Sequence, residues 1–98
     1  MAIYTAATEV HETLAASTVD TVTLTAINGS VTVINRSGTS EIYFTVAVSS
    51  PVVPTIGGAN IYVLPAATCS PQIPFAGSKQ VAVSLISSGT PTYSIEAA

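Results

Sequence analysis

Alternation of hydrophobic and polar residues dominates this chain. In the clearest run every second residue is hydrophobic: Ile42, Phe44, Val46 and Val48. The intervening residues, Tyr43 among them, are expected to face away from that hydrophobic side. Five further runs alternate in the same way: 21–26, 30–34, 60–64, 81–85 and 92–96. A period of two residues indicates β-strands that bury one face.

Turn-forming residues separate these runs. Asn28-Gly29 is a strong hairpin signal, because a type I′ turn needs positive φ at both central positions. Two longer loops, 49–59 and 66–78, contain prolines, which exclude them from the centre of a sheet. Residues 72–75 remain compatible with a position at a sheet edge.

The N-terminal stretch is ambiguous. Residues 5–17 are rich in alanine, which suits a helical turn, but Val10 alternates with His11 and Thr13, which favours an extended strand. We therefore predict an N-terminal extended arm or edge strand over residues 1–18, followed by a single β-sandwich domain over residues 19–98.

The predicted fold class is all-β. About seven or eight short antiparallel strands joined by tight turns are typical of a small β-sandwich, with either a jelly-roll or an immunoglobulin-like topology. The chain has no Trp and a single Cys, so the Cys…Trp…Cys pattern of a true immunoglobulin domain is absent.

Charge is unusually scarce. Charged residues make up 7% of the chain, against about 25% in a typical soluble domain. The net charge is −3, and the only basic residues are Arg36 and Lys79. They are too few to neutralise the phosphates of a nucleic acid or to attract anionic lipid, so we expect neither nucleic acid nor membrane as a partner. We also see no spanning segment and no signal peptide, and the single Cys69 fits synthesis in a reducing cytoplasm.

Candidate catalytic or metal-binding chemistry is sparse. Glu9 and His11 are expected on one face of a strand and Glu12 on the other, and no second cluster completes a metal site. A Ser-His-Asp triad would have to use Asp20, and no nucleophile-elbow motif is present. Cys69 has no neighbouring positive charge to favour its thiolate. We therefore predict a protein that is not an enzyme, without catalytic residues, metal or cofactor.

Aromatic side chains are better candidates for binding. An exposed tyrosine anchors an interface at low entropic cost, and arginine is also enriched at such positions. The candidate interface residues are Tyr4, Tyr43, Tyr62 and Arg36. For each tyrosine the alternative is that it packs across strands onto a neighbour. Because so few charges protect the strand edges, we expect much of the surface to be buried in an assembly.

Three segments carry a resemblance to a known class of proteins. They are residues 31–46 (VTVINRSGTSEIYFTV), 57–65 (GGANIYVLP) and 83–96 (VSLISSGTPTYSIE). Together they resemble small β-rich virion proteins of tailed phages, notably phages that infect actinobacteria. Proteins of this kind are capsid decoration (cement) proteins or minor capsid proteins.

The resemblance implies a structural function in the virion. The protein would be a homo-oligomer, with a trimer as one option, that sits on the outer surface of the capsid and bridges subunits of the major capsid protein. The segment 1–18 would reach a neighbour by strand addition. An alternative is a tail or fibre-associated adhesion module that binds a host surface glycan. That function calls for a cluster of exposed aromatic residues with Asn, Asp or Gln on loops, and we see no such cluster in the loops 49–59 and 66–78.

Overall fold

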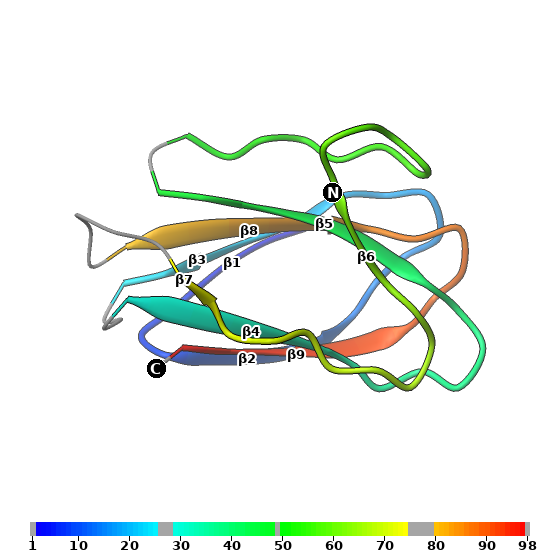
Figure 1. Ribbon diagram of the computed structural model, residues 1–98, viewed down its shortest axis with the longest axis horizontal. Helices are drawn as coiled ribbons and strands as arrows, with labels where there is room; N and C mark the ends of the chain where they lie inside the picture. Colours follow the sequence, from blue (N-terminus) through cyan, green and yellow to red (C-terminus); the bar gives the residue numbers. More distant parts are fainter. Residues whose placement is uncertain (1, 26–28, 49, 75–79, 98) are drawn as a thin grey trace.

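The computed structural model describes residues 2–25, 29–48, 50–74 and 80–97, which form two β-sheets packed face to face (Figure 1). These residues contain nine strands and no helix, so the predicted all-β sandwich is confirmed. The strands are β1 (Ala2–Ala6), β2 (Glu9–Thr13), β3 (Asp20–Leu24), β4 (Ser30–Asn35), β5 (Ile42–Ala47), β6 (Tyr62–Leu64), β7 (Ile73–Pro74), β8 (Val81–Ile86) and β9 (Thr92–Ala97).

The five-stranded sheet has the order β1-β3-β8-β5-β6, and the four-stranded sheet has the order β2-β9-β4-β7. Each of the six alternating runs of the sequence overlaps one of these strands. The short strand β7 lies at the edge of the four-stranded sheet. It falls within residues 72–75, which the sequence left compatible with an edge position. Asn28 of the expected hairpin turn lies outside the described residues, whereas Gly29 has the positive φ of 119° that glycine adopts readily.

The strand pairing is nested. β2 pairs with β9, β3 with β8, β4 with β7 and β5 with β6, and all four pairs are antiparallel. The chain from β2 to β9 therefore behaves as one long hairpin, wound so that successive pairs fall alternately in the two sheets. The pairs β4–β9 and β5–β8 complete the sheets. This is the strand order of a jelly roll, one of the two topologies that the sequence left open.

Strand β1 lies outside this jelly roll. It pairs in parallel with β3 at the edge of the five-stranded sheet, which differs from the expected all-antiparallel arrangement. A parallel pair needs a long crossover connection, and here β2 in the opposite sheet supplies it. Residues 2–13 thus fold onto their own sandwich as two edge strands. Reaching a neighbour as a free arm would require β1 to leave β3.

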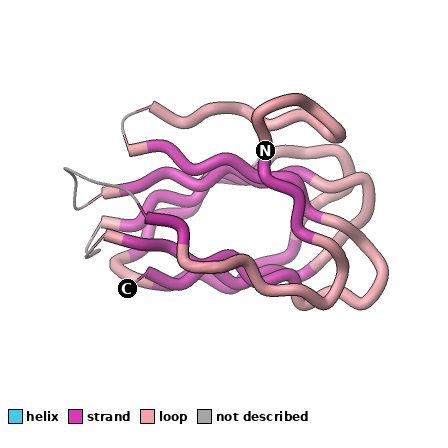
Figure 2. The backbone as a smooth tube through the Cα atoms, viewed as in Figure 1, coloured by secondary structure: helices cyan, strands magenta, loops and turns pink. Residues whose placement is uncertain are grey.

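The backbone trace shows the strands of the two sheets facing each other (Figure 2). One layer of side chains between the sheets forms the core. Alternate residues of the facing strands point inward, and each large aliphatic or aromatic side chain so buried contributes roughly 1.5–3 kcal/mol. The largest fully buried side chains are Leu14, Val22, Leu24, Val31, Val33, Ile42, Phe44, Val81, Val83, Leu85, Tyr93 and Ile95.

Strand β8 departs from the simple alternation. All six of its residues are buried, including Ala82 and Ser84 on the side away from the core. β8 is the central strand of its sheet, and the Ser84 hydroxyl lies 3.2 Å from the Thr21 hydroxyl of β3. On its other side, Thr45 of β5 is buried as well. Small side chains suit this crowded outer face.

A polar contact between β3 and β9 joins the two sheets inside the core. Asp20 projects inward from the start of β3 and is 2% exposed, and it accepts a hydrogen bond of 3.0 Å from the hydroxyl of the fully buried Tyr93 on β9. Burial, followed by the neighbouring Asp20 carboxylate, raises the pKa of Tyr93 above its ordinary value. Tyr93 therefore stays protonated and serves as the donor that a buried carboxylate requires.

We expect Tyr93→Phe to lower the free energy of unfolding by about 1–3 kcal/mol, because the buried Asp20 carboxylate loses its donor. Urea denaturation at neutral pH would measure the change. The matched control is Tyr43→Phe, which removes a half-exposed hydroxyl bonded to Glu41 and should change stability by no more than about 0.5 kcal/mol. Equal effects of the two substitutions would contradict the importance of the Asp20–Tyr93 contact.

Alkaline pH should weaken the fold through the same tyrosine. Because the pKa of Tyr93 is raised in the folded state, the unfolded chain releases this proton first as the pH rises above the ordinary value of 10.0. Titration of Tyr93 should therefore leave the free energy of unfolding unchanged below about pH 10. Above that pH the free energy of unfolding should fall by about 1.4 kcal/mol per pH unit for this one proton. Partial burial and nearby carboxylates also raise the pKa of Tyr4 and of Tyr43, which adds to the decline. In urea titrations Tyr93→Phe should show a shallower decline, and an unchanged slope would refute this assignment.

Candidate interaction surface

The first candidate for chemistry lies on the outer face of the four-stranded sheet. His11 on β2 stands directly opposite Ser94 on β9, with 2.7 Å between its Nδ1 and the Ser94 Oγ. The His11 Nε2 lies 3.3 Å from the Glu9 Oε2. Glu9 and His11 share a face as the sequence predicted, whereas the contribution of Ser94 depends on long-range pairing that no local pattern shows.

This row of groups has the order of a serine hydrolase triad but lacks the rest of such a site. Ser94 is 3% exposed and lies beneath the imidazole, so a substrate has no access to its hydroxyl. Its backbone belongs to β9, which pairs on both sides with β2 and β4, so its N–H groups cannot form an oxyanion hole. The three residues form a polar contact between neighbouring strands.

The four candidate interface residues do not form one surface. Tyr4 on β1 and Tyr62 on β6 lie at opposite edges of the five-stranded sheet. Tyr43 points outward from β5, where its hydroxyl donates to a Glu41 carboxylate oxygen at 3.3 Å. Arg36 is exposed just after β4, in the other sheet. Only Tyr62 belongs to a larger apolar surface.

The two edges of the sandwich differ sharply in charge. At the edge made by β1 and β2, Glu9 faces Glu96 directly across the strands. Glu12 points inward from β2, close enough to Tyr4 to raise its pKa together with partial burial and Asp20. We call this side of the molecule the acidic edge.

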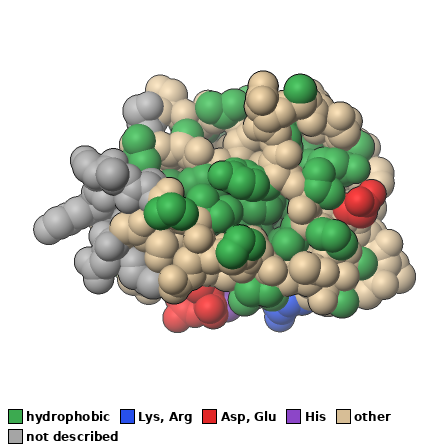
Figure 3. Space-filling model, in the orientation of Figure 1, with side chains coloured by type: hydrophobic (Ala, Val, Ile, Leu, Met, Phe, Trp, Pro, Cys, Tyr) green, Lys and Arg blue, Asp and Glu red, His purple; other side chains and the backbone are tan. Residues whose placement is uncertain are grey.

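The opposite side is formed by β6, β7 and the loop segments 50–61 and 65–72, and we call it the neutral edge. Its described residues include no Asp, Glu, Lys, Arg or His. Figure 3, which shows the molecule with β6 and β7 in front, has hydrophobic side chains gathered across the centre of this face and charged side chains at its margins. Lys79 lies outside the described residues.

Several large apolar side chains of the neutral edge are exposed to solvent. The exposed fractions are 55% for Val52, 67% for Val53, 42% for Ile56, 50% for Tyr62 and 50% for Val63. Isolated apolar residues on a surface are ordinary, but a group of them on one face without charges marks an interaction site. The neutral edge is therefore the candidate functional surface of this protein.

Tyr62 stands at the centre of the neutral edge. Its ring stacks on the buried ring of Phe44, with 5.1 Å between the ring centroids and 20° between their planes. The cross-strand pairing of Phe44 with Tyr62 places both rings on the same face of the sheet. Phe44 thus supports one side of the tyrosine ring, and half of the side chain remains exposed for a partner.

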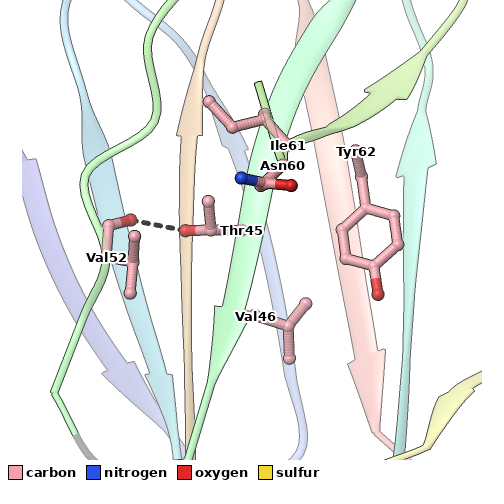
Figure 4. A pocket seen from close by; sticks show the side chains of 6 residues that line it. All are labelled: Thr45, Val46, Val52, Asn60, Ile61 and Tyr62. Carbon is pink, nitrogen blue, oxygen red and sulfur yellow. Dashed lines mark hydrogen bonds between the residues drawn. The ribbon is translucent and has the colours of Figure 1, made fainter. Parts of the chain in front are cut away.

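A hollow of about 570 Å³ opens beside Tyr62 (Figure 4). It is lined by Thr45, Val46, Val52, Asn60, Ile61 and Tyr62. Tyr62 also lines a smaller and more apolar hollow of about 200 Å³, together with Phe44, Leu64, Cys69 and Ile73. The exposed thiol of Cys69 therefore belongs to the neutral edge.

The loop segment 50–61 is held in place by specific contacts. The Thr45 hydroxyl donates a hydrogen bond to the carbonyl oxygen of Val52, which fastens the loop over the outer face of β5 (Figure 4). Further along, the Gly58 N–H donates to the Thr55 carbonyl oxygen at 3.1 Å, and Gly57 between them has a φ of 72°. That turn requires the glycine.

A buried amide fixes the position of β6. Asn35, 2% exposed, donates from Nδ2 to the carbonyl oxygens of Ser40, Leu64 and Pro65, at 2.7, 3.2 and 3.2 Å. Its Oδ1 accepts from the Ser37 N–H at 3.0 Å. The end of β4 therefore supports the chain that carries Tyr62 and Val63 on the neutral edge.

Sequence reasoning picked out Tyr62 but missed the neutral edge around it. The signal was present, because residues 42–78 contain no Asp, Glu, Lys, Arg or His. Val52, Val53 and Ile56 of the loop 49–59 are exposed apolar side chains, which a prediction based on polar residues alone does not identify. A search for uncharged stretches would have found this region.

The part of the chain that the structure describes contains no group of three or more His, Cys, Asp or Glu side chains able to hold a metal ion. Within it, no helix is long and apolar enough to cross a membrane. Comparison of the chain with protein-family models, with curated proteins and with solved structures gave no significant match.

The bond between Thr45 and Val52 should control the order of the loop segment 50–61. We expect Thr45→Val to speed hydrogen exchange of the loop amides and to lower the free energy of unfolding by about 1 kcal/mol, because the hydroxyl donor is lost. Thr45→Ser keeps the hydroxyl and should preserve the protection. Equal protection in the two variants would show that this hydrogen bond does not hold the loop.

Proposed function

We propose that this protein is a capsid decoration protein of a tailed phage, which binds the outer surface of the shell and bridges subunits of the major capsid protein. The observation that carries the proposal is the neutral edge, an uncharged face with exposed valine, isoleucine and tyrosine side chains. Such a face is stabilised when it is covered. The proposed function is therefore binding within an assembly rather than catalysis.

A repeating shell suits a small domain with modest contact surfaces. Each copy has a mass of only 9.9 kDa and offers limited area to a partner. When one copy touches two neighbouring shell subunits, the second contact forms at high effective concentration, so two weak contacts hold firmly. Disassembly of the shell then requires many such contacts to break.

Two further observations support the proposal. The segments that resemble virion proteins include β6 and most of β4, β5, β8 and β9, and therefore supply strands to both sheets. Jelly rolls are also a common architecture of viral capsid domains. This second point is an analogy at the level of the fold, which many unrelated functions share.

The alternative, an adhesion module that binds a host surface glycan, gains one feature from the structure. Tyr62 and Asn60 line the same hollow, which places an exposed aromatic ring beside an amide. A sugar ring stacks its C–H bonds on such an aromatic face, and an amide bonds its hydroxyl groups. The other lining residues are mainly aliphatic, which favours a protein partner.

Quantitative mass spectrometry of purified virions, with capsids separated from tails, would test the proposal. We expect this chain in the capsid fraction, at a copy number comparable with that of the major shell protein. A few copies confined to the tail fraction would favour the adhesion module instead. Absence from both fractions would reject both functions.

A further inference from the structure

The chemistry of the neutral edge restricts what can cover it. An ordinary protein surface has about a quarter of its residues charged. Placed against the neutral edge, such a surface would bury charges with no counter-charge, at a cost of several kcal/mol per ion. A matching partner must itself present an uncharged apolar face. The neutral edge of a second copy is a face of that kind.

The acidic edge excludes the other ways of joining two sandwiches at their edges. Two acidic edges in contact would bring together Glu9, Glu12 and Glu96 of both copies, and like charges at close range repel. An acidic edge against a neutral edge would bury these carboxylates without a donor or a cation. Contact between two neutral edges avoids both costs.

We propose that the neutral edge is a self-association surface, through which two copies of this chain form a dimer. A contact of one patch with the same patch on the partner requires a twofold axis. The expected assembly is therefore a dimer, in contrast to the trimer that the resemblance to virion proteins offers as an option. The inference goes beyond the proposed function, because it concerns the free protein, in which no shell subunit covers the neutral edge.

The features of the neutral edge suit such a contact. Tyr62 is a pre-oriented anchor, since Phe44 already supports one side of its ring. The two hollows that Tyr62 lines offer space for apolar side chains of the partner, such as the exposed Val53 and Val63. Val53 lies between Pro51 and Pro54, and the prolines reduce the conformational freedom that binding would remove.

Sedimentation equilibrium of the purified chain over a range of concentrations tests the proposal, because it measures the mass of the species in solution. We expect twice the 9.9 kDa of one copy at high concentration. Val63→Lys should raise the dissociation constant by roughly a hundredfold or more, because each dimer would bury two unpaired ammonium groups. Ile3→Lys is the matched control, since Ile3 is 69% exposed on β1 at the acidic edge, and this variant should remain dimeric.

A second substitution keeps the test decisive if Val63→Lys fails to fold. Val53→Lys changes a loop residue that is 67% exposed, and it should dissociate the dimer in the same way. The native Cys69 provides an independent readout on the unmodified chain. Its reaction with a maleimide should slow as the protein concentration rises, and in Val63→Lys the rate should not depend on concentration.

Three outcomes would overturn the proposal: a monomer at every concentration, a trimer mass, or a dimer that Ile3→Lys dissociates and Val63→Lys does not. The proposed function, capsid decoration, is tested separately from self-association. A monomer that is abundant in capsids would refute self-association and leave decoration standing. A dimer that is absent from virions would refute decoration and leave self-association standing.

Discussion

The packing of two sheets across one layer of aliphatic side chains is the interaction on which the rest of this structure depends. Nested pairing from β2 to β9 brings inward-facing residues of distant segments together, and their burial stabilises a chain that has few charges and no disulfide. The layer is thin, so a polar group enters it only with a partner. Asp20 and Tyr93 meet that condition by bonding to each other across the two sheets.

The same nesting determines how the edges of the sandwich are exposed. Glu9, Glu12 and Glu96 lie on β2 and β9, at one end of the four-stranded sheet, whereas β7 lies at its other end. Acidic charge therefore collects on one side of the molecule. The other side is formed by described residues between 50 and 74, none of which is charged. Charge protects a sheet edge against association, and the neutral edge lacks that protection. This asymmetry is the structural basis of the proposed binding function.

The contact of Glu9, His11 and Ser94 shows how geometry limits the meaning of residue types. The His11 Nδ1 lies 2.7 Å from the Ser94 Oγ, and its Nε2 lies 3.3 Å from the Glu9 Oε2. Catalysis also needs an accessible nucleophile and preorganised donors for the developing negative charge. A buried serine on a fully paired strand offers neither, so the constellation contributes to the packing of the sheet.

The sequence by itself determined the local features of this protein. A period of two residues is a property of neighbours along the chain, so the runs that become β3, β4, β5, β6, β8 and β9 were predictable, as were the outward direction of Tyr43 and the shared face of Glu9 and His11. Only the tertiary structure decided the jelly-roll order, the parallel pairing of β1 with β3 and the contact of His11 with Ser94. It also decided that Tyr62 lies in an apolar face with Val53 and Val63, whereas Tyr4, Tyr43 and Arg36 lie elsewhere. The physical reason is that alternation specifies which face of a strand is buried, whereas the neighbour of each strand depends on contacts between distant segments, which become favourable only when the whole core closes.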